Sequence, residues 1–298
     1  MKIILSRKGF DSTSGGYPSP ILDGNRLVSF PIPENMNLLN VQEKEYVHKY
    51  ANLRVNDNLS YLDLMKQLLP DKEKQLKLEK ENIVLDKNTV CHLDPQINNP
   101  NIYNNGTEYC GLFGQSGSAN SHLLKTCNVS KGDLFLFFGW FRDAYKIDEK
   151  YKYIPEKGFT DKHVIWGWLE IGEIKNVSEI DKINNKFKGH PHVWKTGDKN
   201  NYTIYISTDK LSIDNRLPGA GLFPYNDLLV LTKEGMPKSK WDLPEFFKGK
   251  ISYHDENNFK KDYFQSTYRG QEFVTETDDK ILKWVKNKFS ILKDCENE

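Results

Sequence analysis

The chain has 298 residues, of which 38% are hydrophobic and 12% aromatic, so it is long enough to bury a sizeable core. Its 42 basic and 41 acidic residues leave a formal charge of +1, which argues against a strongly basic surface that coats nucleic acid but allows a local basic groove. The four cysteines form no CxxC pair and no apolar run approaches the ~18 residues of a membrane span, so we predict a soluble, cytoplasmic protein without a zinc ribbon, disulfide framework or membrane partner.

The first 35 residues are predicted to form a strand, a loop and a second strand. KIIL and RLVSF are the apolar runs, and the turn-forming sequence PSPILDGN lies between them. Residues 41–85 differ, because their apolar side chains recur at spacings of three and four amid many charges. We interpret this segment as a helical insert.

From about residue 87 to about residue 270 the pattern is that of strands. Four segments are dense in aromatic and β-branched residues: GDLFLFFGWF (132–141), HVIWGWLEIGEI (163–174), NYTIYIS (201–207) and NDLLVLT (226–232). The last stretch, DDKILKWVKNKFSIL, returns to helical spacing behind two aspartates that favour a helix start. The predicted fold class is α+β in a single domain over residues 1–298: a strongly bent mixed sheet or partial barrel, with the helical insert and a C-terminal helix.

Polar side chains gather directly after the first predicted strand, in SRKGFDSTSGG. Two basic side chains, three hydroxyls and the amides of two glycines could together hold a phosphate. This is not a Walker loop, because GxxxxGK[ST] is absent, and an ordinary surface turn explains the same pattern equally well. The candidate ligand-binding residues here are Ser6, Arg7, Lys8, Asp11, Ser12 and Ser14.

The segment CHLDPQ places His92 and Asp94 two positions apart, so on a strand both would point to the same face. A carboxylate can orient an imidazole and stabilise its cation, which makes the pair a candidate general base. The same two side chains could instead form a structural polar pair beside the turn at Pro95. We name His92 and Asp94 as catalytic candidates.

GLFGQSGSANSHLL is a glycine-rich stretch that leads into a helix expected to begin near Ser121. Glycines let backbone amides approach a ligand, and a helix N-terminus favours an anion. The amide of Gln115 could read the edge of a base. Many ordinary turns share this spacing. We assign Gly114 and Gln115 to nucleotide binding and name His122 as another residue for proton transfer.

FFGWFRD and WGWLEIGE combine tryptophans with Arg142. An exposed indole such as that of Trp140 could stack on a planar base, but aromatic residues at period two more often fill a core. We assign Trp140 and Arg142 to nucleotide binding, on the condition that at least one indole is exposed.

GHPH puts His190 and His192 on one face of any extended segment. Two imidazoles this close can bind a metal or relay protons. Because no HExxH motif or second ligand cluster accompanies them, we expect no metal and assign both histidines to nucleotide binding.

Toward the C-terminal end, polar residues again surround an apolar strand. ISYH contributes His254, and STYRGQEFV contributes Arg269, Gln271 and Glu272. These residues suit a site that grips a polar ligand, with Glu272 as a catalytic candidate and the other three as nucleotide-binding candidates. A plain Arg–Glu surface pair would contribute little.

Seven segments, taken in this order, resemble the bacterial and phage family called nucleotide modification associated domain 3: SRKGFDSTSGGYPSPI, HLDP, FGQSGSANSHL, GDLFLFFGWFR, WGWLEIGEI, HPH and RGQEFV. The resemblance covers nearly the whole chain and is weakest between residues 41 and 85. It implies an association with genes that modify nucleotides or DNA bases, in DNA modification or phage defence, without fixing a reaction.

Two other resemblances imply different functions. GDLFLFFGWF and WGWLEIGEI are similar to the strand pattern of PUA-like domains, which bind nucleic acid and modified bases, and imply a reader without catalysis. QEFV before the last helix is similar to the glutamate-bearing strand of ADP-ribosyltransferases, which implies that Glu272 holds the nicotinamide ribose and Arg7 the phosphates of NAD.

We favour an enzyme that transfers a group to a nucleobase or nucleotide, because a bare recognition surface needs fewer ionisable residues than these loops carry. A nucleotide or DNA base is the expected ligand, with single-stranded DNA as a further candidate. A sensor that binds a nucleotide without turnover is a fourth alternative. The cofactor, the group donor and the oligomeric state stay open.

Overall fold

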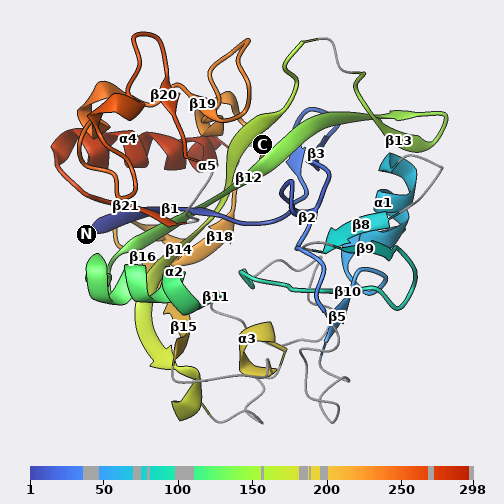
Figure 1. Ribbon diagram of the computed structural model, residues 1–298, viewed down its shortest axis with the longest axis horizontal. Helices are drawn as coiled ribbons and strands as arrows, with labels where there is room; N and C mark the ends of the chain where they lie inside the picture. The colour runs from blue at the N-terminus through green and yellow to red at the C-terminus, as the bar shows by residue number, and fades with distance from the viewer. Residues whose placement is uncertain are drawn as a thin grey trace.

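The computed structural model of the chain describes residues 1–35, 47–69, 75–78, 81–97, 111–155, 158–180, 187, 189–194, 201–267 and 272–294. A ten-stranded mixed sheet lies at its centre (Figure 1). The main path of the sheet runs in the order β11 (Leu112–Ser116), β15 (Tyr202–Ser207), β14 (Lys162–Asn176), β12 (Leu134–Ile147), β1 (Lys2–Arg7) and β21 (Glu272–Glu276). β1 pairs with β12 in parallel and with β21 antiparallel.

The remaining strands are short. Three of them pair with the main path: β3 (Ser19–Leu22), β13 (Lys150–Tyr153) and β18 (Ala220–Leu222). A fourth, β4 (Arg26–Leu27), pairs with β3. The small separate sheets consist of β2 (Ser14–Gly15), β8 (Gln75–Leu78) and β9 (Glu81–Val84); β5 (His48–Lys49) and β10 (Val90–Cys91); β6 (Arg54–Asn56) and β7 (Leu59–Ser60); β16 (Lys210–Leu211) and β17 (Asp214–Pro218); and β19 (Lys240–Trp241) and β20 (Phe264–Gln265).

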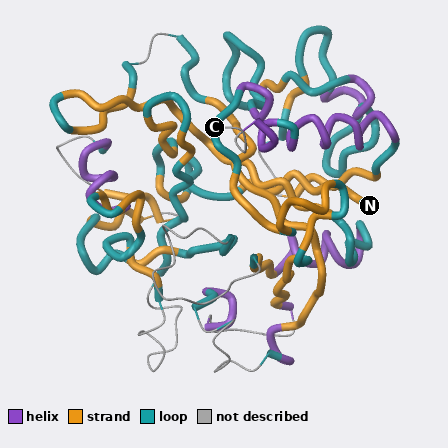
Figure 2. Tube along the Cα trace, turned by 180° about the vertical axis from the view of Figure 1, so that it is seen from behind, coloured by secondary structure: helices purple, strands orange, loops and turns teal. Residues whose placement is uncertain are grey.

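The helices lie around the edge of the strands, as the view from behind shows (Figure 2). They are α1 (Tyr61–Leu68), α2 (Gly117–Ser121), which continues as a π-helix (His122–Thr126), α3 (Pro191–Trp194), α4 (Asp279–Phe289) and α5 (Ile291–Asp294). Among the described residues, no helix is long and apolar enough to cross a membrane.

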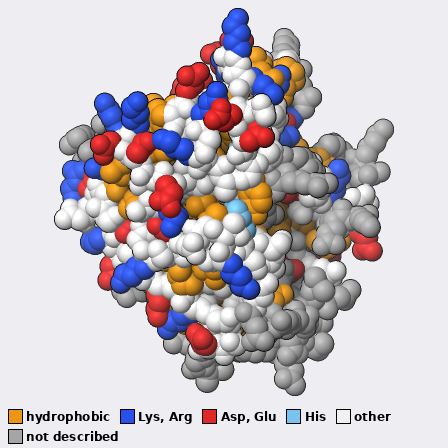
Figure 3. Space-filling model, turned by 60° about the vertical axis from the view of Figure 1, so that its left-hand side comes forward, with side chains coloured by type: hydrophobic (Ala, Val, Ile, Leu, Met, Phe, Trp, Pro, Cys, Tyr) orange, Lys and Arg blue, Asp and Glu red, His pale blue; other side chains and the backbone are white. Residues whose placement is uncertain are grey.

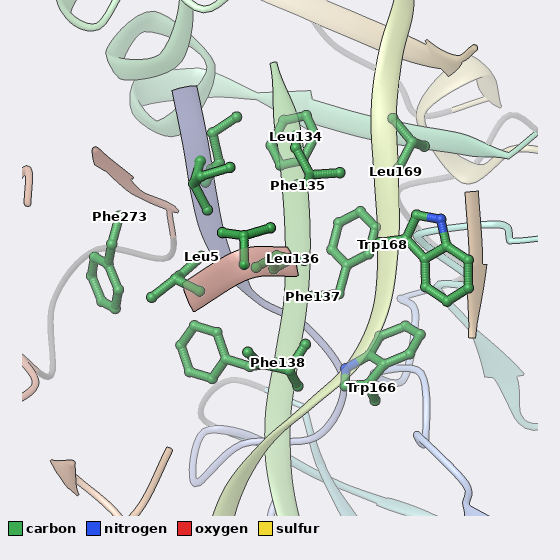
Figure 4. Close-up of a cluster of buried hydrophobic side chains, with 14 of the residues drawn as sticks. Leu5, Leu134, Phe135, Leu136, Phe137, Phe138, Trp166, Trp168, Leu169 and Phe273 are labelled. Atoms are coloured by element: carbon green, nitrogen blue, oxygen red, sulfur yellow. The ribbon is translucent and has the colours of Figure 1, made fainter. Parts of the chain in front are cut away.

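The apolar run LFLFF makes β12 the central strand, because a strand buried on both faces needs apolar side chains in both directions. Phe135 and Phe137 stack on one face with ring centroids 5.8 Å apart. Phe138 packs on the other face against Trp241, at 5.2 Å. Figure 4 shows part of this core, in which side chains of β1, β12 and β14 pack together.

The sheet is strongly bent, and a contact between its two edges demonstrates this. β11 and β21 end the main path on opposite sides, yet the Gln115 side chain of β11 donates a hydrogen bond to Glu272 of β21, with 2.6 Å between Nε2 and Oε1. No backbone ladder joins these two strands, so the sheet is not closed into a barrel. The predicted α+β class is confirmed.

Within the described part of residues 41–85, the predicted helical insert is helical at α1 alone. Where KEKQLKLEKENI indicated a helix, β8 and β9 form an antiparallel hairpin. In β8, Leu76 is fully buried and Lys77 is exposed, so the segment alternates with the period of a strand. Burial of Leu76 in a hydrophobic cluster outweighs the local helix propensity. The division into one domain with an insert stays a prediction.

Most of the other predicted strands and the C-terminal helix are confirmed, and two predicted elements differ. β12, β14 and β15 confirm the strands at 132–141, 163–174 and 201–207, and α4 confirms the C-terminal helix, capped by Asp278. NDLLVLT is not a strand, because Asn226 caps a 3₁₀ turn at Asp227–Leu229. The helix expected near Ser121 begins earlier, at Gly117, directly behind β11.

Candidate functional site

Histidines and carboxylates from distant parts of the chain meet in one largely buried group. They come from the segment before residue 36, from β5, from the segment after β10 and from the start of α3. We call this group the histidine cluster: Glu34, His48, His92, Asp94, His190 and His192.

Backbone pairing places Glu34 beside His92. The amide of Glu34 donates to the carbonyl of Val90 (3.0 Å), and the amide of His92 donates to the carbonyl of Ile32 (2.8 Å). The two chain segments therefore run side by side, and Nδ1 of His92 lies 2.5 Å from Oε2 of Glu34. Because a carboxylate accepts, Nδ1 of His92 donates this hydrogen bond, and in the neutral ring the lone pair lies on Nε2.

Asp94 lies at the centre of the cluster. Its Oδ1 accepts the amide N–H of Gly114 (2.8 Å) and lies 3.2 Å from Nε2 of His190. Its Oδ2 lies 3.5 Å from Nε2 of His192 and 3.9 Å from Nε2 of His92. Burial would raise the pKa of the Asp94 carboxyl, but the hydrogen bonds and charges of His190 and His192 hold it well below its usual range.

Two imidazoles of the cluster, those of His48 and His192, are held neutral. Burial lowers the pKa of His192 to about 3, against the opposing effect of Asp94, and burial lowers the pKa of His48 to about 4. Nε2 of His192 lies 3.2 Å from Nε2 of His92. The Asp94 carboxylate and the Nε2 atoms of His92 and His192 therefore surround one point, an arrangement able to accept a proton or to bind a metal ion.

A small cavity of about 50 Å³ lies beside the cluster. Its wall is mostly apolar and aromatic and includes Tyr61, Leu93, Asp94, Pro95, Trp166 and Phe223. Asp94 thus belongs both to the cluster and to the cavity wall.

A second polar group surrounds Glu272, which is 1% exposed. Its Oε1 accepts hydrogen bonds from Gln115 (2.6 Å), Lys8 (3.1 Å) and Ser6 (3.3 Å). We call these four residues the Glu272 cluster. The structure thereby brings together four predicted site residues. The carboxylate of Glu272 is hydrogen-bonded to the side chains of the other three.

The structure places His122 and His254 beside Ser252. Nε2 of His122 lies 3.0 Å from Oγ of Ser252, and its ring packs on Tyr253 with centroids 4.1 Å apart. Nδ1 of His254 lies 3.0 Å from the carbonyl of Ser252, and its Nε2 accepts the amide of Thr267. Burial lowers the pKa of both histidines.

The polar loop after β1 is held by its own hydrogen bonds. Oδ1 of Asp11 accepts the amides of Thr13 (2.7 Å) and Ser14 (2.8 Å), and the amide of Gly16 donates to the Asp11 carbonyl (2.9 Å). Ser12 offers its carbonyl to Lys77. Phosphate binding by this loop stays a prediction.

The remaining candidates lie apart from these groups. Lys238 covers the ring of Trp140 at 3.9 Å, and Nε of Arg142 donates to Asp161 (2.7 Å). Arg7 lies near the buried His163, whose pKa its charge helps to lower. Trp166 and Trp168 are core residues, 7% and 3% exposed. Arg269 and Gln271 fall outside the described residues.

Sequence reasoning missed Glu34, His48 and Gln96. Glu34 is 58 positions from His92, and no spacing rule connects residues so far apart. His48 lies in the segment that we interpreted as helical. Gln96, which donates to the carbonyl of Gly189 (2.8 Å), follows His92 and Asp94 at the same spacing of two and could have been found from that pattern.

The chain is similar to one family of known proteins over most of its length. A model of the family described as nucleotide modification associated domain 3 matches residues 2–276. Comparisons with curated proteins and with solved structures gave no significant match. The family match confirms the resemblance drawn from the sequence motifs.

Proposed function

Since the chain belongs to the nucleotide modification associated domain 3 family, we propose that it is an enzyme that modifies a nucleobase or nucleotide at the histidine cluster. The description of the family suggests a role in nucleotide modification. Support for catalysis comes from one observation: Asp94 belongs both to the histidine cluster and to the wall of the cavity. Ionisable groups with shifted pKa values beside a cavity are typical of active sites.

The cavity favours a single base or nucleotide as ligand. Its wall combines apolar and aromatic side chains with the carboxylate of Asp94, which is the composition typical of small-molecule sites. Trp166 and Phe223 supply aromatic surface of the kind that packs on a planar base. Basic and acidic side chains are interspersed on the face shown in Figure 3, which offers no extended basic surface for a duplex.

The experiment that tests this proposal incubates the purified protein with a panel of nucleotides, NAD and short single-stranded DNA, with cell extract to supply group donors. Mass spectrometry then searches every nucleotide for a mass change. We expect one nucleotide class to be modified, and we expect Asp94→Asn to lower the rate by at least about 100-fold, the effect of losing a group that acts in proton transfer or its equivalent.

The matched control is Asp214→Asn, since Asp214 pairs with Arg216 in β17, and its rate should equal that of the wild type. Binding of nucleotide or DNA with no mass change would contradict catalysis and favour a reader or a sensor. Consumption of NAD with transfer of ADP-ribose would favour the NAD-using alternative. A rate unchanged by Asp94→Asn would show that the reaction does not take place at the histidine cluster.

A further inference from the structure

Three atoms at the centre of the histidine cluster form a compact triangle. Its corners are Nε2 of His92, Oδ2 of Asp94 and Nε2 of His192, with sides of 3.2, 3.5 and 3.9 Å. Charge-assisted hydrogen bonds to a carboxylate are usually about 2.7–2.9 Å long, so the two contacts to Oδ2 are too long for strong bonds of this kind.

The same triangle has the dimensions of a metal site. An atom at the point equidistant from the three corners would lie about 2.1 Å from each, which matches Zn–N and Zn–O distances of about 2.0–2.2 Å. The three residues are also close enough for every pair of ligand atoms to lie within 4.8 Å.

Neighbouring contacts orient two of the three ligands, His92 and Asp94. Glu34 accepts the hydrogen bond from Nδ1 of His92, and Nε2 of His92 faces the other two ligands. Gly114 and His190 contact Oδ1 of Asp94, whereas Oδ2 faces His92 and His192. Carboxylate–histidine pairs and hydrogen-bonded carboxylates of this kind surround metal ligands in many proteins.

Charge supports a cation at the same point. Glu34 and Asp94 bring two carboxylates into a site where both side chains are less than a tenth exposed. Buried carboxylates are costly unless a positive charge balances them. Two imidazoles and one carboxylate suit Zn²⁺ or Fe²⁺ rather than Mg²⁺ or Ca²⁺, which prefer oxygen ligands.

From this geometry we infer that His92, Asp94 and His192 bind a single divalent transition-metal ion, with Glu34 and His190 as positioning residues. Three protein ligands leave at least one coordination position for water or substrate, as in catalytic metal sites. Asp94 also lines the neighbouring cavity. If the proposed function holds, the metal would polarise the group that reacts in the cavity. Metal binding itself does not depend on that function.

The test uses the full chain without any nucleotide. Protein treated with a chelator is titrated with Co²⁺, whose visible absorption reports its ligands. We expect one Co²⁺ to bind per chain. We expect Asp94→Asn and His192→Ala to weaken its affinity by at least about 100-fold and His190→Gln by about 10- to 100-fold. Asp214→Asn should bind like the wild type. No saturable binding, or binding unchanged by Asp94→Asn, would overturn the inference.

A measurement on the wild type alone covers the case in which these variants do not fold. X-ray absorption of the Zn²⁺-loaded protein counts imidazole ligands, and we expect two, with nitrogen or oxygen atoms completing the shell. A shell without imidazole overturns the inference. A protein that binds the metal through two imidazoles but modifies no nucleotide would retain this inference and lose the proposed function.

Discussion

At His92 the two ring nitrogens have different partners, and this difference decides what the residue can do. Nδ1 faces Glu34, whereas Nε2 faces His192 and Asp94. The carboxylate of Glu34 selects the tautomer and raises the basicity of Nε2. A residue that sequence reasoning missed therefore controls one that it identified.

Glu34→Gln tests this control. The amide keeps the shape of the side chain but loses its charge, so it can no longer enforce the proton on Nδ1 of His92. We expect the affinity for Co²⁺ to fall by about 10- to 100-fold, measured by the same titration. Glu173→Gln serves as the control, because Glu173 is half exposed and pairs with Lys175. An equal affinity for Co²⁺ in Glu34→Gln and Glu173→Gln would show that Glu34 does not contribute to metal binding.

His163 makes stability depend on pH at a place remote from the site. Its Nδ1 accepts the indole N–H of Trp241 (3.0 Å), and burial lowers its pKa from 6.5 to about 3. Between pH 6.5 and about 3, His163 is therefore protonated in the unfolded chain but neutral in the folded chain. This contribution to stability is complete above pH 6.5 and is lost as the pH falls toward about 3.

His163→Asn keeps an acceptor for Trp241 but removes the titration. Urea unfolding across this pH range should show a slope of unfolding free energy against pH that is smaller by up to about 1.4 kcal/mol per pH unit, the value for one proton. A slope equal to that of the wild type would mean that other groups carry the acid sensitivity.

At the scale of the element, β11 separates the two polar groups. Successive side chains of a strand point to opposite faces, so Phe113 and Gln115 face the interior of the bent sheet and Gly114 faces the histidine cluster. The sequence placed Gly114 and Gln115 together in one ligand-binding loop. The structure assigns them to different groups, because the glycine-rich stretch begins as a strand.

Gly114→Ala is predicted to damage the histidine cluster. A Cβ atom there would lie 2.4 Å from Cδ2 of His192 and 2.6 Å from Cε1 of His190, so both rings would have to shift. We expect the free energy of unfolding to fall by about 1–3 kcal/mol and Co²⁺ binding to be lost.

Gly132→Ala is the control for this prediction. A Cβ atom at Gly132 meets open space, but its φ of +86° is unfavourable for alanine. It should cost about 1 kcal/mol and leave Co²⁺ affinity intact. Denaturant unfolding and the metal titration together separate loss of stability from loss of the site. Intact Co²⁺ binding in Gly114→Ala would show that the rings tolerate displacement.

At the scale of the whole molecule, the Glu272 cluster joins the two edges of the sheet. Ser6 and Lys8 come from β1 and the residue after it, Gln115 from one edge strand and Glu272 from the other. Lys8 also lies over the ring of Phe113, at 4.5 Å from its centroid. The bend of the sheet and the pairing of these charges therefore depend on each other.

A structural and a catalytic role of Glu272 can be separated. Glu272→Gln leaves the buried Lys8 ammonium without its carboxylate, and we expect it to cost about 3–5 kcal/mol of stability. The double variant Lys8→Met with Glu272→Gln should recover most of this loss. If Glu272 is catalytic, nucleotide modification stays lost in the stable double variant. Recovered activity would make the residue structural.

Sequence reasoning succeeded where the physical signal is local. The apolar run of β12 and the helical spacing of α4 are each contained in one segment, so their prediction needed no knowledge of the rest of the chain. It failed at β8 and β9, where burial of Leu76 against distant residues overrode helix propensity. It also failed at NDLLVLT, where one side-chain cap replaced the strand.

The sequence by itself determined the family, the α+β class, the central strands and the residue pairs His92 with Asp94 and His190 with His192. Only the tertiary structure decided that these pairs meet, although His92 and His192 are 100 positions apart, and that Glu34 joins them. The physical reason is that a side chain's type and near neighbours are written in the sequence, whereas contacts between distant segments follow from strand order, register and the bend of the sheet.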